Sequence, residues 1–166
     1  MQISPIETAG LTLVPLAVSH AAEMAGILAD PALHSFIGGT PCSAEELTAR
    51  YERLVAGSPD PAQLWWNWVV RLRDENRLTG TVQATLTRTD GGWTAEVAWV
   101  VGTAWQGRGI ASEAARGLVD GLRAQGVRDV HAHVHPEHTA SAAVARAAGL
   151  APTDRVRDGE IRWELP

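Results

Sequence analysis

Residues 95–125 decide how the rest of this chain folds. They read Ala95-Glu-Val-Ala-Trp-Val-Val101, then Gly-Thr-Ala-Trp, then Gln106-Gly-Arg-Gly-Ile-Ala111, and continue into a long amphipathic segment. This order predicts a strand, a short turn, a glycine-flanked loop and a helix. Such a loop aims unpaired backbone N–H groups at one point, at the positive end of the helix. Because Gly107 and Gly109 let a ligand approach the backbone, the stretch predicts an anion site, with phosphate as the expected anion.

The composition is typical of a globular domain of ordinary size. The chain has 166 residues, of which 45% are hydrophobic and 20% charged, so we expect one domain over residues 1–166. The net charge of −5 argues against nucleic acid as a partner, because neutralising phosphates requires a basic face. The single cysteine, Cys42, suits a reducing compartment. With neither a leader pattern nor an apolar run of about 18 residues, we expect a cytoplasmic protein without membrane contact.

The first part of the chain predicts a short strand and two helices. The strand covers residues 11–16, and Ser19 is a candidate N-cap for a helix that runs to about Ala29. A loop rich in glycine follows. Residues 43–46, Ser-Ala-Glu-Glu, form a capping box that starts a second helix, and Gly57 comes at its end.

From Leu64 the hydrophobic period changes to two, which predicts strands. Trp66 and Trp68 fall on an apolar face and Trp65 falls on the opposite face. Asp74-Glu-Asn76 and Asp90-Gly-Gly92 are turn signals. Three antiparallel strands in sequence are therefore expected, over residues 64–72, 80–86 and 93–101.

The last part of the chain alternates between helix and strand patterns. The helix that follows the glycine loop ends at Gly126. A further strand (130–134), a short helix (139–148) and a closing hairpin (152–156 and 161–165) are expected after it.

The glycine loop fits one of three phosphate-binding patterns. A P-loop requires G-x-x-x-x-G-K-[ST], which the chain lacks. A dinucleotide fingerprint requires a third Gly or Ala where this chain has Ser112, and an acid at the end of the next strand, whereas Asp129 stands at its beginning. The third pattern, Q-x-x-G-x-A, is met by Gln106, Gly109 and Ala111.

With this loop in place, the chain resembles the GCN5-related N-acetyltransferases (GNAT), in particular the ribosomal-protein N-terminal acetyltransferase-like (RimJ/RimL-type) branch. The resemblance covers nearly the whole length and is densest over residues 96–101, 106–114, 133–141 and 148–150. It implies an α/β fold: a mostly antiparallel, twisted sheet of about seven strands, splayed between the fourth and fifth, with helices on both faces. Those two strands, 93–101 and 130–134, are expected to be parallel neighbours.

The resemblance also implies acetyl-coenzyme A as cosubstrate. Backbone N–H groups of residues 106–111 would hold its pyrophosphate, with side-chain contacts from Arg108 and Ser112. The pantetheine arm would lie beside Trp99 and Val101, although the Trp99 side chain is equally consistent with core packing. His138 stands where the branch commonly has Asn. The implied cofactor-binding residues are Trp99, Val101, Gln106, Gly107, Arg108, Gly109, Ile110, Ala111, Ser112 and His138.

Two residues match catalytic positions of the family. Glu96 matches the position that often serves as base, usually through water, and its alternative role is a structural carboxylate. Ser141 matches the serine near the coenzyme sulfur, and its alternative role is that of an ordinary first-turn serine. Many relatives carry a tyrosine as general acid where this chain has Ala145, so the expectation for Ser141 is stronger.

The histidines allow a rival interpretation as a metal site. His131, His133 and His135 alternate along one strand, and His138 follows. The outer two of the three are about 13 Å apart, and only Glu137 stands beside them in sequence, so we expect no metal. One histidine acting as a proton relay is the more plausible role.

The acceptor side is the least defined by sequence. Phe36, Tyr51 and Trp65 are candidates for an aromatic acceptor pocket, with packing under the first two helices as the alternative. The expected reaction is acetyl transfer to a primary amine, on a protein N-terminus, an antibiotic, a polyamine or a metabolite, by direct attack in a ternary complex of a monomer or homodimer. Cys42 lies far from the motifs, so no acyl-enzyme is expected. The alternative function is a non-catalytic acyl-coenzyme A sensor or interaction module.

Overall fold

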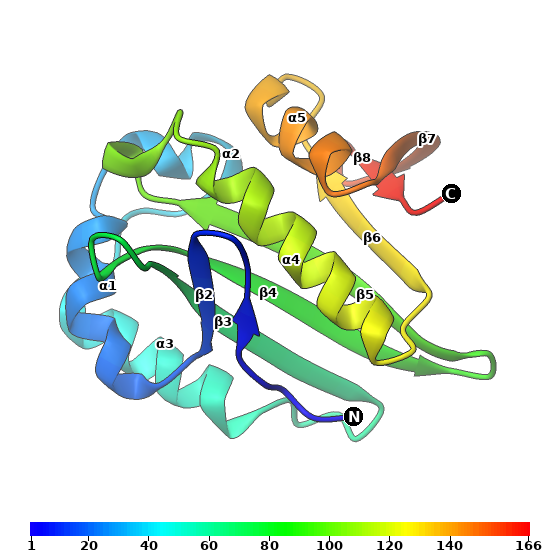
Figure 1. The fold of residues 1–166 in the computed structure, drawn as a ribbon, viewed down its shortest axis with the longest axis horizontal. Helices are drawn as coiled ribbons and strands as arrows, with labels where there is room; N and C mark the ends of the chain where they lie inside the picture. Colours follow the sequence, from blue (N-terminus) through cyan, green and yellow to red (C-terminus); the bar gives the residue numbers. More distant parts are fainter.

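A single eight-stranded sheet with helices on both faces organises the chain (Figure 1). The computed structural model describes the backbone of residues 1–166 and every side chain except those of Phe36 and Ile37. The strands are β1 (Ile6–Glu7), β2 (Leu11–Pro15), β3 (Gln63–Leu72), β4 (Arg77–Thr89), β5 (Gly92–Val101), β6 (Asp129–Val134), β7 (Ala151–Arg157) and β8 (Glu160–Glu164). The α-helices are α1 (Ala21–Ile27), α2 (His34–Ile37), α3 (Ala44–Ala56), α4 (Ile110–Ala124) and α5 (Thr139–Ala147).

The strand order is β1-β2-β3-β4-β5-β6-β8-β7, and all neighbours are antiparallel except β5 and β6. The parallel pair is short: Thr94–Glu96 pair with Asp129–His131. Beyond Glu96 no described strand pairs with that edge of β5, and β6 diverges from it (Figure 1). The predicted α/β fold and the splay between these strands are confirmed.

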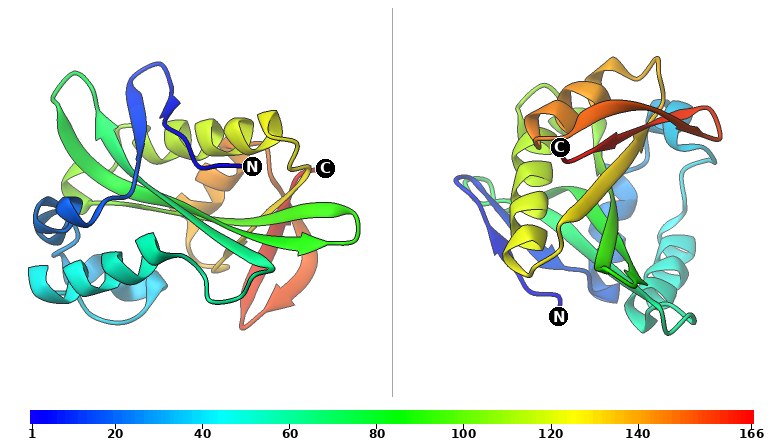
Figure 2. Two further views of the ribbon diagram at one scale, coloured as in Figure 1. Left: turned by 90° about the horizontal axis from the view of Figure 1, so that it is seen from below. Right: turned by 90° about the vertical axis from the view of Figure 1, so that its right-hand side faces the viewer.

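Helices α4 and α5 pack on one face of the sheet, and α1 and α3 on the other (Figure 2). Strand alternation produces this division, because Trp66 and Trp68 enter the core beneath α4 while Val69, the residue after Trp68, enters the smaller core beneath α1 and α3. The expected apolar face of residues 64–72 is therefore confirmed. Among the described residues, none of the helices combines the length and the apolar character that crossing a bilayer requires.

Local structure departs from the sequence prediction near the N-terminus. Ser19 does not cap α1, because Val18–His20 form a 3₁₀ turn and the Ala17 N–H donates to His20 Nδ1. The two-residue strand β1 and the four-residue helix α2 were not expected. The capping box of α3 is confirmed: the Glu46 N–H donates to Ser43 Oγ at 3.1 Å and the Ser43 N–H to Glu46 Oε1 at 3.0 Å.

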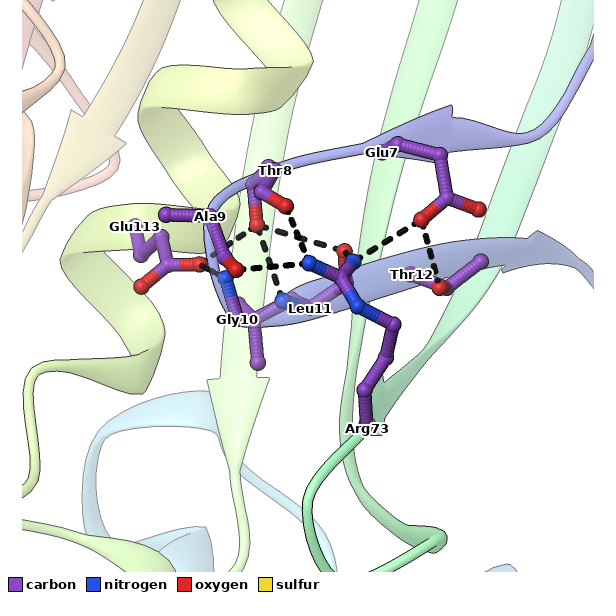
Figure 3. A network of polar contacts seen from close by, with 8 residues as sticks. All are labelled: Glu7, Thr8, Ala9, Gly10, Leu11, Thr12, Arg73 and Glu113. Atoms are coloured by element: carbon purple, nitrogen blue, oxygen red, sulfur yellow. Dashed lines mark hydrogen bonds and ion pairs between the residues drawn. The ribbon is translucent and has the colours of Figure 1, made fainter.

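A polar network ties the start of α4 to the turn between β1 and β2 (Figure 3). Glu113, in the first turn of α4, accepts hydrogen bonds from the Thr8 hydroxyl and from the Gly10 N–H at 2.8 Å. From the other side, the Arg73 guanidinium forms an ion pair with Glu7 at 2.8 Å. Arg73 also donates to backbone carbonyl groups of the turn, those of Thr8, Ala9 and Leu11. The N-terminal residues thus hold the helix that follows the glycine loop.

Candidate active site

The glycine loop has the geometry of an anion cradle. Gly107 and Gly109 both have φ near +77°, a left-handed conformation that side chains disfavour, and Gly109 is the N-cap of α4. A Cβ atom at either glycine would meet nothing within 4 Å, so the space beside the backbone is open. The first N–H groups of α4 have no intrahelical acceptor and lie at the positive end of the helix dipole.

Side chains around the loop fix its position. Gln106 Nε2 donates to the carbonyl oxygen of Val101 at 3.0 Å, which holds the loop against the end of β5. Arg108 forms an ion pair with Glu75 at 2.6 Å and lies over the Trp105 ring, 5.2 Å from its centroid. The side chain of Ile110 is buried in the core, and those of Ala111 and Ser112 are half-buried. Ile110 and Ala111 therefore offer backbone groups to a ligand.

Trp99 and Ser141 connect the two sides of the splay. The half-buried indole of Trp99, on β5, donates to Ser141 Oγ on α5 at 3.1 Å. Because Ser141 accepts this bond, its own hydroxyl hydrogen is available for another partner. Both residues line a cavity beside the open edge of β5.

That cavity, of about 630 Å³, extends through the splay from one face of the sheet to the other. It is lined by residues that are far apart in the sequence, among them Cys42, Tyr51, Glu96, Trp99, His133, His138, Ser141 and Arg157. The Tyr51 hydroxyl is buried and has no hydrogen-bond partner among the described atoms. Trp65 lies outside the described lining residues, and its indole donates to Gln63. Phe36 lies outside the residues whose side chains are described.

A cluster of charged and titratable side chains surrounds Glu96. The Arg157 guanidinium binds both carboxylate oxygens, at 2.9 Å each. His133 Nδ1 lies 3.4 Å and His131 Nε2 3.7 Å from Glu96 Oε1. The His131 imidazole and the Arg157 guanidinium, acting against burial, lower the pKa of Glu96 to about 2. Glu96 is therefore a carboxylate across the physiological pH range.

The two imidazoles beside Glu96 are well buried. The His133 side chain is 7% exposed and that of His131 11%, with the rings in an edge-to-face arrangement. Burial lowers the pKa of His133, opposed by the Glu96 charge and reinforced by Arg157. His133 is therefore predominantly neutral at pH 7. Burial likewise lowers the pKa of His138, which precedes α5 and lines the same cavity.

A carboxylate distant in sequence lies beside the predicted histidines. Glu137 is the carboxylate that neighbours them along the chain, whereas the parallel pairing of β5 and β6 places Glu96 next to His131. Ligand atoms of Glu96, His131 and His133 lie within 4.8 Å of one another, a spacing compatible with a metal ion. In this arrangement, however, the guanidinium of Arg157 already supplies a cation to both Glu96 oxygens.

Other cavity residues were also missed. Arg157 and Glu160 reach the cavity from the closing hairpin, and Cys42 reaches it from the loop before α3. The distance of Cys42 from the motifs along the sequence is therefore no measure of its distance from the site. A local pattern gives no signal for such residues, because only the tertiary fold brings them together.

Comparison with known proteins supports this architecture. A family model described as "Acetyltransferase (GNAT) domain" matches residues 10–151. Three solved structures share the fold: a GNAT-family acetyltransferase from Bacillus anthracis (19% identity, 98% of each chain, TM-score 0.77), the ribosomal L7/L12 α-N-protein acetyltransferase RimL in complex with coenzyme A (16%, 97% of each chain, 0.79), and the microcin C7 self-immunity acetyltransferase MccE in complex with acetyl-CoA and AMP (15%, 94% and 92%, 0.76). A comparison with curated proteins gives no match.

Proposed function

The chain belongs to the GNAT family of acetyl-coenzyme A-dependent acetyltransferases, and on that premise we propose that it acetylates a primary amine bound in the 630 Å³ cavity. The observation that carries this proposal is the cavity itself, which joins the open edge of β5 to Ser141 on one side and to Glu96 and His133 on the other. An acetyl donor and an amine acceptor entering from opposite faces would meet at the splay.

On the donor side, backbone N–H groups of residues 106–111 bind the pyrophosphate, and Arg108 and Ser112 add side-chain contacts. The pantetheine arm lies along Trp99 and Val101 as an additional extended segment, because that edge of β5 has no described strand partner. His138, at the N-cap of α5, takes the place of the usual asparagine.

Ser141 assists departure of the thiol. The leaving thiolate must gain a proton or be stabilised, and a hydroxyl at this point supplies a hydrogen bond. The bond from Trp99 Nε1 fixes the orientation of Ser141 Oγ and leaves its hydrogen to donate.

The acceptor enters beneath α1 and α3. The buried Tyr51 hydroxyl, whose pKa burial raises to about 12, stays protonated and is available to hydrogen-bond the acceptor. The acceptor is a protein N-terminal amine, as named for RimL, or a small amine such as an antibiotic, polyamine or metabolite. We expect a cytoplasmic enzyme of one domain that acts as a monomer or homodimer.

Transfer occurs by direct attack of the amine on the thioester, without an acyl-enzyme. Cys42 lines the cavity and is the one thiol of the chain, so it offers a direct test. Cys42→Ser should retain activity within about twofold, and initial-rate kinetics should show a ternary-complex pattern. A ping-pong pattern that disappears in Cys42→Ser would contradict direct attack.

The experiment that tests the function is a thiol-release assay with acetyl-coenzyme A and a panel of amines. The panel contains a tetrapeptide with a free α-amine, spermidine, an aminoglycoside and benzylamine. Release above the hydrolysis background with at least one amine, with the acetylated product seen by mass spectrometry, is expected. Tight coenzyme binding without turnover of any amine would instead favour a non-catalytic sensor.

A further inference from the structure

His133 lies at the point where the sheet opens. The pairing between β5 and β6 ends at Glu96 and His131, and His133 is the next residue of β6 on the same face. Of the two histidines, only His133 is among the described residues that line the cavity. Its imidazole thus stands where the acceptor and the thioester would meet, on the face of the sheet that carries Glu96.

The His133 ring is buried and incompletely bonded. It is 7% exposed, and Nδ1 has no hydrogen-bond partner among the described atoms, although Glu96 Oε1 lies 3.4 Å away. Catalytic hydrogen bonds are often long before substrate binds and shorten in the complex. A carboxylate opposite Nδ1 favours the tautomer with the proton on that nitrogen, which leaves the lone pair of Nε2 to accept a proton.

Glu96 is not suited to accept that proton itself. Both of its oxygens are bound by Arg157, and its pKa of about 2 is far below that of any primary amine. A carboxylate held in this state can instead orient a neighbouring imidazole and stabilise the imidazolium.

We propose that His133 is the general base for acetyl transfer and that Glu96 is its positioning residue. This assignment rests on the proposed acetyltransferase function, and it replaces Glu96 as the expected base. His133 takes one proton from the acceptor ammonium, and the freed nitrogen attacks the thioester carbonyl. As the C–N bond forms and the C–S bond breaks, the second amine proton passes to the thiolate. His133 then releases its proton to solvent, so one amide, one thiol and one proton are the products.

Charged groups from four strands set the proton affinity of His133. Glu96 on β5 raises its pKa, whereas His131 on β6, Arg157 on β7 and Arg162 on β8 lower it. Two variants should therefore move the acidic limb of the pH profile in opposite directions. Glu96→Gln should shift the pH at which kcat/KM falls to a lower value, and Arg157→Ala should shift it to a higher value.

The kinetic test measures kcat/KM against pH with saturating acetyl-coenzyme A and the best acceptor of the amine panel. His133→Gln should lower kcat/KM by about 10² or more at pH 7. Its remaining rate should rise with pH as the free-amine fraction rises. Glu96→Gln should cost about tenfold, and the exposed Glu52→Gln on α3 serves as control. Loss of the acidic limb in Glu96→Gln, with the limb intact in His133→Gln, would overturn the proposal.

A second measurement does not depend on knowing the acceptor. Nitrogen NMR of ¹⁵N-histidine-labelled protein with coenzyme A bound reports the pKa and tautomer of His133. We expect a pKa below 6.5, lower still in Glu96→Gln and higher in Arg157→Ala. An identical pKa in all three proteins would overturn the proposed coupling. Absence of turnover with every amine, with this coupling intact, would instead contradict the proposed function.

The ¹⁵N-histidine-labelled protein also shows whether His133 acts as a general base or as a metal ligand. Activity and the His133 signal should be unchanged after EDTA treatment. Loss of activity in EDTA that one equivalent of Zn²⁺ restores would make His133 a ligand together with Glu96 and His131, and would overturn its role as base. Coenzyme A should still raise the melting temperature of His133→Gln, which shows that this variant is folded.

Discussion

The proposed donor side of the site, in the glycine loop, and the proposed acceptor side, in the cavity, are built in different ways. The donor side is one contiguous stretch, residues 106–112, and presents mainly backbone groups whose positions follow from two glycines and a helix start. The acceptor side draws Tyr51, Glu96, His133 and Arg157 from separate elements, and its chemistry depends on side-chain charges. A site made of backbone groups suits a ligand that is always the same, such as the coenzyme. A site made of side chains can differ in residue types according to the acceptor. Substitutions on the two sides should therefore have different effects on coenzyme binding, turnover and stability.

The largest effect should come from breaking the donor side at Gly109. Gly109→Val forces a β-branched residue into φ near +77° and places a side chain in the anion cradle. We expect acetyl-coenzyme A affinity to fall by about 10² or more, measured by calorimetry. Gly91→Val is the matched control, because that glycine lies in an exposed turn with nothing within 4 Å of its Cβ position. Equal affinities in both variants would contradict the cradle.

Alanine substitutions at Ser141 and Ser112 should affect turnover and coenzyme binding separately. Ser141→Ala should lower kcat by about tenfold with coenzyme affinity unchanged, since it removes a hydrogen bond to the developing thiolate. Ser112→Ala should weaken coenzyme binding a fewfold with kcat unchanged. Initial-rate kinetics and calorimetry on both proteins provide the check. Parallel losses of kcat and affinity in Ser141→Ala would make that residue a binding contact instead.

A substitution at Glu113 tests whether the turn between β1 and β2 helps to hold the donor side in place. Glu113→Ala removes the carboxylate that accepts from the Thr8 hydroxyl and is the described acceptor of the Gly10 N–H, which should cost about 1–3 kcal/mol of unfolding free energy. Coenzyme affinity should fall by a smaller, fewfold factor through displacement of the helix start. Urea unfolding and calorimetry report the two effects, with the exposed Glu45→Ala as control. A change in kcat with unchanged stability would argue against this anchoring role.

The smallest effect concerns acid stability on the acceptor side. The pKa of Glu96 is lowered from 4.5 to about 2, so its ionised form stabilises the folded protein above pH 4.5, and this contribution is lost as the pH falls toward 2. Glu96→Gln lacks the contribution at every pH. The difference in unfolding free energy between wild type and Glu96→Gln should therefore shrink between pH 4.5 and 2. A difference that stays constant would mean that Glu96 is not held ionised by its neighbours.

Features set by local chemistry could be predicted from the sequence. The capping box at Ser43 and Glu46, the alternation that buries Trp66 and Trp68, and the glycine loop all depend on a few neighbouring residues. The capping prediction at Ser19 was wrong because a 3₁₀ turn, held by the His20 side chain, precedes α1. The strand β1 and the helix α2 are too short to show a hydrophobic period.

Contacts between distant segments could not be predicted. Parallel pairing of residues 93–101 with 130–134 was expected, but the register that places Glu96 opposite His131 leaves no trace in either segment alone. Arg157 reaches Glu96 because the closing hairpin pairs with β6 through β8, which no local pattern encodes. The glycine-loop motif was therefore enough to predict acetyl-coenzyme A as the donor, whereas the surroundings of His133 could be described only from the tertiary structure.

The unpaired edge of β5 also bears on solubility and purification. A strand edge with free N–H and C=O groups is a template for pairing with another chain, and proteins usually cover such edges. Here the coenzyme arm would act as that cover over residues 97–101, beyond the point where the pairing of β5 with β6 ends. The ligand-free protein would then be the form prone to self-association, and coenzyme A in the buffer would protect it as an added strand does.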